Sequence, residues 1–232
     1  MIRVDRAELT RNEIIRVAAN RFLNDGFTKT TVASMAKSLN MSTGNMTFHF
    51  PTKDHMLAEL VNILARYQHK LMEEEARDGY SSVMAICLEL LTIASACEQD
   101  EVAKDFFLST YRSQICMDLI RKNDKERAKE VFRDYCSDWT DERFEEAETL
   151  VSGIEYASLM TTSNSASLEF RISGALNTIL SIYNVPEDIR KQKIDKVLAM
   201  DYKSLGLNML QKFRDYVDRE TEQALHNLLA RK

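Results

Sequence analysis

Helix start and stop signals follow one another closely between Ile14 and Pro51, and this spacing limits the fold more than any other feature of the sequence. Ile14, Ala18 and Phe22 repeat at helical spacing, and Gly26 ends that pattern. Pro51 ends a later segment, because a proline disfavours helical backbone at the residue before it. Two further helices must therefore fit between Gly26 and Pro51, and each is predicted to have only about two turns.

Each of these two short helices is preceded by a residue suited to begin it. Thr30 or Thr31 precedes one apolar stretch and Ser42 precedes the other, and hydroxyl side chains at such positions accept hydrogen bonds from free backbone N–H groups. Met46 and Phe50, one turn apart, are expected to face inward. Two short helices joined by a tight turn are typical of the helix-turn-helix that enters the major groove of DNA. The expected buried face of the first helix is Val32, Met35, Ala36 and Leu39, and Asn40 offers a left-handed residue that can end this helix.

The second helix of the pair leaves small polar groups on its outer side. Such groups can reach base edges and phosphates when the helix lies in a groove. Gly44 would let the backbone approach another surface closely, although a frayed first turn is an alternative interpretation. The residues predicted to contact DNA in this region are Thr30, Thr31, Ser42, Thr43, Gly44, Asn45, Thr47, Phe48 and His49.

Lys53 is a further candidate for a DNA contact. Thr52 is predicted to cap the next helix, which places Lys53 in its first turn, where the positive end of the helix dipole disfavours a cation. A DNA phosphate would remove that conflict. The alternative is a solvated lysine compensated by Asp54, and we favour the phosphate contact because of the motif that precedes it.

Composition extends the helical interpretation to the whole chain. Only 6 Gly and 2 Pro among 232 residues leave few turn formers for hairpins. We predict an all-α protein with a three-helix DNA-binding head over residues 1–56 and a helical bundle over residues 57–232. A helix from Thr52 to about Leu71 would bridge them. Further helices are predicted near 82–98, 101–121, 124–137, 141–162, 168–183, 187–200 and 203–230.

Charge is distributed unevenly along the chain. Residues 1–56 carry eight Lys or Arg and five Asp or Glu, whereas the whole chain has a net charge of −5. A slightly basic head on an acidic remainder suits contact with a polyanion. No apolar run of membrane-spanning length and no signal peptide is evident, which predicts a cytoplasmic protein without a membrane partner.

Residues that could carry chemistry are scattered. The cysteines match neither a zinc pattern nor a redox pair, so they are interpreted as reduced core side chains. The histidines show no metal-binding spacing, and no phosphate-binding glycine loop is present. We therefore predict no catalytic residue, no metal and no cofactor. The residues concerned are Cys87, Cys97, Cys116, Cys136, His49, His55, His69 and His226.

One segment of the predicted bundle mixes polar and aromatic side chains. Phe107, Tyr111 and Gln114 share a face of the predicted helix 101–121, and Arg112 lies beside them. A ligand cavity needs mostly apolar walls with a few donors and acceptors, which these four residues could supply. An ordinary core helix with a wet edge explains the same pattern equally well.

The N-terminal pattern resembles that of the tetracycline-repressor (TetR) family of bacterial regulators over about residues 8–68. Two positions differ, because Thr47 stands where the family usually has a tyrosine that contacts phosphate, and Phe48 replaces a commoner polar or tyrosine residue. The matching positions are Ile14, Ala18, Phe22, Gly26, Thr30, Thr31, Ala36, Ser42, Gly44, His49, Phe50, Lys53 and Asp54.

The resemblance implies a homodimer that binds operator DNA. By analogy the dimer interface falls within about residues 141–183, where small residues lie beside larger apolar ones. A repressor released by a small hydrophobic or amphipathic ligand is the expected function. There are two alternatives. One is a ligand-independent DNA-binding protein of the same fold, and the other is an all-helical enzyme or interaction module. The interface residues considered are Leu150, Gly153, Ile154, Ala157, Gly174, Ala175, Leu176 and Leu180.

Overall fold

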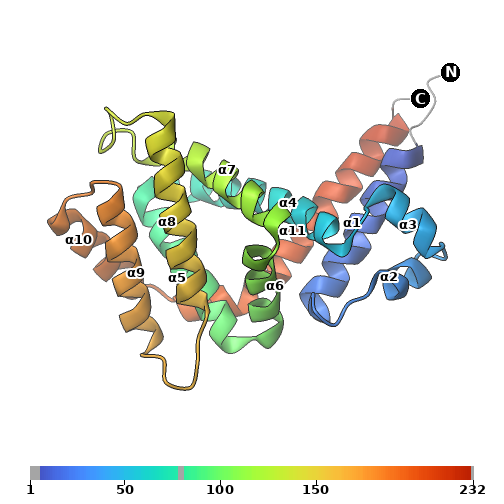
Figure 1. Ribbon diagram of the computed structural model, residues 1–232, viewed down its shortest axis with the longest axis horizontal. Coiled ribbons are helices and arrows are strands. Elements are labelled where there is room, and N and C mark those ends of the chain that lie inside the picture. The colour runs from blue at the N-terminus through green and yellow to red at the C-terminus, as the bar shows by residue number, and fades with distance from the viewer. Residues whose placement is uncertain (1–5, 78–80, 231–232) are drawn as a thin grey trace.

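The N-terminal head consists of three helices, α1 (Arg6–Asn24), α2 (Val32–Ser38) and α3 (Thr43–His49) (Figure 1). The computed structural model describes residues 6–77 and 81–230, and within these ranges every regular element is a helix. Gly26 has φ +94° and Asn40 has φ 51°, so both take the left-handed conformation that ends a helix. The ring of Phe27 packs edge-on against Phe22 with 5.0 Å between centroids. The expected helix stops in the head are confirmed.

A long helix, α4 (Lys53–Arg77), leaves the head and continues into the remainder of the chain. It passes without interruption through the predicted domain boundary at residues 56 and 57, so that boundary stays a prediction. The following helices are α5 (Ser82–Gln99), α6 (Glu101–Arg112), α7 (Gln114–Val131), α8 (Asp141–Leu159), α9 (Leu168–Ile182), α10 (Glu187–Leu198) and α11 (Tyr202–Ala230). We call α1 to α3 the head and α5 to α10 the body.

Helix α5 forms the centre of the body. Its 18 residues are apolar enough, with a mean hydropathy of 1.3, to satisfy the length and composition of a membrane span, which corrects the expectation that no segment does so. Two-thirds of that segment, 67%, is buried against other helices of the chain, as in the core helix of a globular fold. All four cysteines are free and buried, and Cys87 on α5 is completely so, which confirms them as core side chains.

The predicted helices 101–121 and 124–137 are wrong at their shared boundary. Ser113 ends α6 and begins α7, with an extended backbone at φ −86° and ψ 120°. Neither Gly nor Pro marks this break, so apolar periodicity runs across it in the sequence. Phe132 then ends α7, and residues 133–137 form turns. Tyr111 and Gln114 consequently belong to different helices and do not share a helical face.

Helix α11 runs from the body to the head, where it lies beside α1 (Figure 1). Near its start, Gln99 of α5 donates a hydrogen bond to the carbonyl of Lys203 at 3.2 Å. At Gly206 the two helices approach so closely that an added Cβ would lie 2.9 Å from the backbone nitrogen of Ala96. Glycine therefore permits the crossing of α11 over α5.

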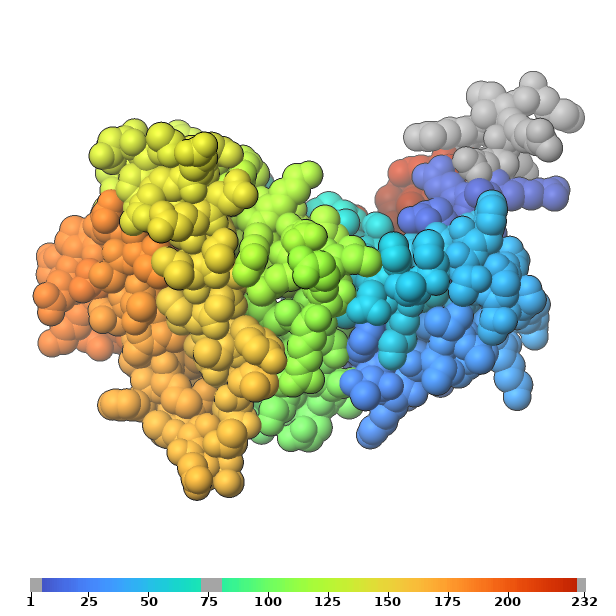
Figure 2. All heavy atoms as spheres, in the orientation of Figure 1, coloured from blue at the N-terminus to red at the C-terminus, as the bar shows by residue number. Residues whose placement is uncertain are grey.

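The far half of α11 packs against the head. Val217 is completely buried, Thr221 is buried, and the Arg16 guanidinium on α1 lies 4.0 Å from the Asp218 carboxylate. On the face drawn in Figure 2, most of α11 lies behind the head and body. Two helices, α4 and α11, thus extend from the body to the head.

Candidate nucleic-acid interface and its connection to the body

The caps predicted for α2 and α3 are present. Thr31 accepts a hydrogen bond from the Ser34 N–H at 3.1 Å, and the Ser34 hydroxyl accepts one from the Thr31 N–H at 3.3 Å. Ser42 accepts a hydrogen bond from the Asn45 N–H at 3.1 Å. These bonds satisfy backbone donors that a helix leaves free at its start, and they fix where α2 and α3 begin.

Thr30 lies inside the head rather than on its surface. It is only 4% exposed, and its hydroxyl donates to the carbonyl of Gly26 at 2.8 Å. The suggestion that Thr30 contacts DNA is therefore corrected, because its hydroxyl holds the turn that precedes α2. The neighbouring Thr31 is exposed.

The outer side of α3 presents a mixed polar and apolar surface. Thr43, Gly44 and Asn45 are exposed, while Met46 on the opposite side is completely buried. Phe48 is 80% exposed, with its ring 5.4 Å from that of half-buried His49. Thr47 donates a hydrogen bond to the carbonyl of Gly44. In a major groove, polar groups of this kind read base edges and an apolar ring can contact a thymine methyl group.

Arg11 connects α1 to the end of α3, and sequence reasoning missed it. Its guanidinium donates to the carbonyl of His49 at 2.6 Å and lies 4.2 Å from the centre of the Phe50 ring. A cation at the carbonyl end of a helix is favoured by the helix dipole. No local signal reveals this contact, because Arg11 lies in a different helix from its partners.

Lys53 is held by the head itself. Its ammonium donates to the carbonyls of Phe27 and Thr30, at 2.6 and 2.9 Å, and lies 4.0 Å from the centre of the Phe27 ring. Burial lowers the pKa of Lys53, against the opposing effect of Asp54 and Asp105. An ammonium has three N–H donors, so one remains for a phosphate. Contact with DNA phosphate stays a prediction for this residue.

The body touches the head through α6. The Asp105 carboxylate accepts a hydrogen bond from the Thr28 N–H at 2.8 Å and a second one from the Thr28 hydroxyl. A Cβ added to Gly26 would lie 2.9 Å from Asp105 Oδ2, so a side chain there would strike the carboxylate. This contact connects α6 to the turn before α2, and sequence analysis did not identify it.

Two of the four predicted ligand-binding residues lie together. Phe107 and Tyr111 face a small cavity bounded by α4 to α8, and Tyr111 donates to Glu155 at 3.0 Å. Burial and the Glu155 charge raise the pKa of the Tyr111 hydroxyl. Arg112 and Gln114 are both exposed. The Gln114 amide donates a hydrogen bond to the Asp118 carboxylate at 3.2 Å. The break at Ser113 separates Gln114 from the cavity, whereas Arg112 lies on α6 beside Tyr111 but is exposed.

Ionic groups continue from this cavity into the body. Arg127 donates to Glu89 at 2.8 Å and lies 3.4 Å from Asp124. Burial raises the pKa of Asp124 to about 6 and that of Glu148 to about 7. The Tyr183 hydroxyl donates a hydrogen bond to the Glu148 carboxylate. Among the residues that the structure describes, no group of three His, Cys, Asp or Glu side chains is arranged to hold a metal ion.

The three-helix head, with α3 presented by its caps, defines a helix-turn-helix protein of the DNA-binding class. Residues 14–60 match the family model described as bacterial regulatory proteins, tetR family. These residues therefore form a DNA-binding domain of the kind that this family model describes. The match covers α2 and α3 completely, together with most of α1 and the start of α4.

Comparison with individual proteins gives shorter or weaker matches. The HTH-type transcriptional regulator QacR of Staphylococcus aureus is 29% identical over 68 residues, which cover 29% of this chain and 36% of QacR. The match thus spans about a third of that relative. A gamma-butyrolactone receptor, described as ArpA-like, is 19% identical with a TM-score of 0.43, over 89% of this chain and 98% of that one. CprB of S. coelicolor A3(2) is 22% identical with a TM-score of 0.42, over 87% and 98% of the two chains. Likenesses this weak carry no argument about ligand or partner.

Proposed function

We propose that the protein is a cytoplasmic, non-enzymatic transcriptional repressor that binds operator DNA as a homodimer and is released by a small molecule bound in its body. The exposed outer side of α3, with Thr43, Gly44 and Asn45 presented by the Ser42 cap, is the observation that carries the DNA-binding part. The match of residues 14–60 to the family model supports the same conclusion.

Exposed apolar side chains on α8 and α9 support the dimer. Leu150 is 52% exposed and Phe170 is 76% exposed. A Cβ added to Gly153 or Gly174 would meet no atom within 4 Å, so both helices have open surface where another helix could approach. Ala157 is exposed on the same helix as Gly153. Large exposed apolar side chains on neighbouring helices favour contact with a partner.

Part of the sequence-based interface is corrected. Ala175, Leu176 and Leu180 on α9 are buried in the body and are not available to a second subunit. Ile154 is half-buried. The proposed interface therefore uses the outer residues of these helices and leaves their inner residues to the core.

Dimerisation can be tested at Phe170. Because it is exposed and apolar, replacement by Asp should separate the subunits without unfolding the chain. Light scattering should give a dimer for the parent protein and a monomer for Phe170→Asp. The matched control is Thr162→Asp, in the exposed loop before α9. A monomeric parent protein at micromolar concentration would contradict the proposal.

DNA binding can be tested by selection from random-sequence DNA. A two-fold dimer should select a pseudo-palindrome whose half-site centres lie roughly 34–36 Å apart, about one helical turn. Asn45→Ala should weaken binding to the selected DNA by about 1–3 kcal/mol, if Asn45 reads a base. Asn20→Ala, on the exposed side of α1, is the control. Selection of no shared sequence would contradict specific recognition.

Release by a ligand requires a molecule that binds one head orientation more tightly than the other. The cavity at Phe107 and Tyr111 is the site proposed from the sequence. Both residues belong to α6, the helix whose Asp105 contacts the head. Tyr111→Phe should alter ligand response and leave ligand-free DNA affinity unchanged. The measurement is DNA binding with and without a screened ligand.

A ligand-independent regulator is a second candidate, and one observation favours it. The polar groups around Tyr111 bond to one another, since Tyr111 donates to Glu155 and Arg127 donates to Glu89. A cavity whose polar groups are already paired has less need of a ligand. Failure of a broad metabolite screen to change DNA affinity would favour this candidate.

A further inference from the structure

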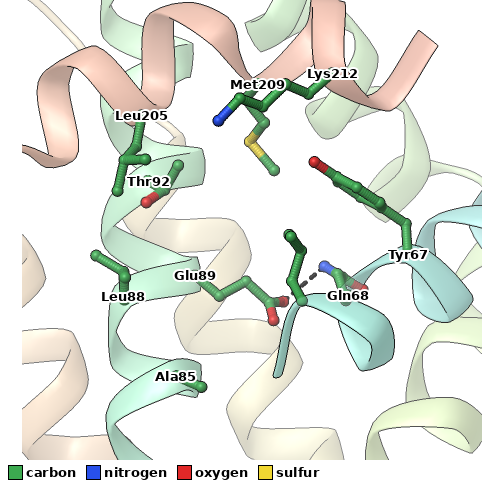
Figure 3. Close-up of a pocket in the computed structure, with 10 residues that line it drawn as sticks. Tyr67, Gln68, Ala85, Leu88, Glu89, Thr92, Leu205, Met209 and Lys212 are labelled. Atoms are coloured by element: carbon green, nitrogen blue, oxygen red, sulfur yellow. Dashed lines mark hydrogen bonds between the residues drawn. The ribbon is translucent and has the colours of Figure 1, made fainter. Parts of the chain in front are cut away.

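A second cavity lies between α4, α5 and α11 (Figure 3). Its volume is about 120 Å³, and it adjoins the cavity at Tyr111, because Gln68 and Glu89 line both. Leu88 from α5 and Met209 from α11 are buried apolar residues of its wall, and Tyr67 contributes an aromatic ring from α4. Walls of this kind fit the apolar part of a small molecule.

The polar groups at the base of this cavity are already paired. Gln68 donates to Glu89 Oε1 at 2.6 Å, the bond drawn in Figure 3. Arg127 donates to Glu89 Oε2 at 2.8 Å from the opposite side, so the carboxylate charge is compensated within the protein. Glu89 therefore does not require a cation from a ligand.

Lys212 is the charged group at the other side of the cavity. It is exposed on α11, and Figure 3 shows its side chain extending along the α11 side of the cavity near Met209. No ion pair or hydrogen bond joins its ammonium to another residue in the described ranges. A free cation beside apolar walls suits a ligand with an apolar chain and an anionic end.

We propose that the cavity between α4, α5 and α11 binds a small amphipathic carboxylate, with its chain against Leu88 and Met209 and its carboxylate at Lys212. The site itself does not depend on the function proposed above. Its consequence for DNA binding does rest on that proposed function.

The cavity is placed to affect the head because its walls include the two long helices that reach the head. Tyr67 of α4 packs against α11, with its ring 5.9 Å from Phe213 and 5.0 Å from Tyr216. Further along, α11 packs against α1. A molecule that changes the separation of α4 and α11 therefore acts on the two long helices that reach the head. A ligand shifts head orientation only if it binds one orientation more tightly.

Three probes with the same alkyl chain separate the contributions of charge and apolar contact. Octanoate, octanol and octylamine should be titrated into the full chain by calorimetry. Octanoate should bind most tightly and octylamine most weakly, because only the carboxylate can pair with Lys212. Equal or tighter binding of octylamine, or failure of all three to bind at millimolar concentration, would overturn the proposal.

Two variants locate the binding. Lys212→Met keeps most of the unbranched side chain but removes the charge, so octanoate affinity should fall about fivefold and octanol affinity should not change. Arg219→Met, an exposed cation on α11 outside the cavity, is the matched control. Ala85→Phe should fill the cavity and abolish binding of all probes. If Ala85→Phe does not fold, Lys212→Met still tests whether octanoate binds at this cavity. Unchanged octanoate affinity in Lys212→Met would refute the site.

DNA binding distinguishes this site from the function proposed above. The selected operator should be titrated with protein in the presence and absence of octanoate. Octanoate binding that requires Lys212 supports the site whether or not DNA affinity changes. An unchanged DNA affinity would instead count against release through this cavity. Absence of sequence-specific DNA binding would reject the repressor while the calorimetric result for the site stands.

Discussion

Besides the continuous helix α4, the head meets the rest of the protein at two junctions of different character. At the first, α6 reaches the turn before α2 through one carboxylate, that of Asp105, which holds both the N–H and the hydroxyl of Thr28. At the second, α11 lies along α1 and α4 through buried side chains such as Phe213 and Val217. The first junction is the smaller and its contact with the turn is polar, whereas the second is longer and its buried side chains are mostly apolar.

This difference assigns them different physical roles. Apolar contact is non-directional and scales with buried area, so the α11 junction contributes stability across a range of small displacements. Hydrogen bonds to a carboxylate weaken steeply with angle and distance, so the α6 junction is sensitive to the exact position of the head. We expect substitutions at α11 to reduce the free energy of unfolding and substitutions at Asp105 to alter head orientation.

The largest expected effect is at Phe213. Its ring is 1% exposed and lies near both Tyr67 and Phe106. Phe213→Ala should lower the free energy of unfolding by about 3–5 kcal/mol, because it leaves a cavity where α4, α6 and α11 meet. Chemical denaturation measures this loss. Leu207→Ala, at a 64% exposed position of the same helix, should change stability by less than about 0.5 kcal/mol. Equal effects would show that α11 is not held by this contact.

The crossing of α11 over α5 provides the next test. Gly206→Ala would place a methyl group 2.9 Å from the backbone nitrogen of Ala96, which cannot rotate away as a side chain can. Overpacking of this kind should cost about 1–3 kcal/mol, despite the better helix propensity of alanine. Thermal unfolding of Gly206→Ala and of the exposed control Asn208→Ala makes the comparison. A more stable Gly206→Ala protein would mean that α11 moves aside without cost.

These two junctions also explain what the sequence could and could not predict. The stops at Gly26 and Asn40 and the caps at Thr31 and Ser42 depend on residues within one turn of each other, so local patterns were sufficient. The Asp105 contact joins residues 77 positions apart, and no local pattern encodes such a pairing.

The errors in the body have similar causes. The break at Ser113 has neither Gly nor Pro, and α6 and α7 run in different directions on either side of it (Figure 1). Apolar periodicity alone therefore predicted a single helix that contains both Tyr111 and Gln114. On α9, apolar spacing could not distinguish the inner residues Leu176 and Leu180 from an outer face, because helix periodicity identifies a stripe without specifying what covers it.

The polar junction can be tested with a double-mutant cycle at Gly26 and Asp105. Gly26→Ala should cost about 1–2 kcal/mol from the left-handed backbone alone, and more from the collision with the carboxylate. Asp105→Ala removes that collision, so the double variant should lose less than the sum of the single variants. Denaturation of the four proteins gives the coupling energy. Strict additivity would mean that Asp105 does not lie against Gly26 in solution.

The smallest effect is expected at Lys53, where two roles must be separated. Lys53→Met removes the bonds to the carbonyls of Phe27 and Thr30 and should cost about 1–2 kcal/mol of stability. If the remaining N–H also meets a phosphate, the variant should bind all DNA sequences more weakly, and the slope of log affinity against log salt should become shallower by about 0.9. Lys122→Met, an exposed body position, should alter neither quantity. Reduced stability with an unchanged salt slope would leave Lys53 as a residue that only holds the turn between α1 and α2. A shallower slope would mean that the Lys53 ammonium lies between the two carbonyls and a DNA phosphate. One side chain would then both hold the turn before α2 and contact the DNA backbone.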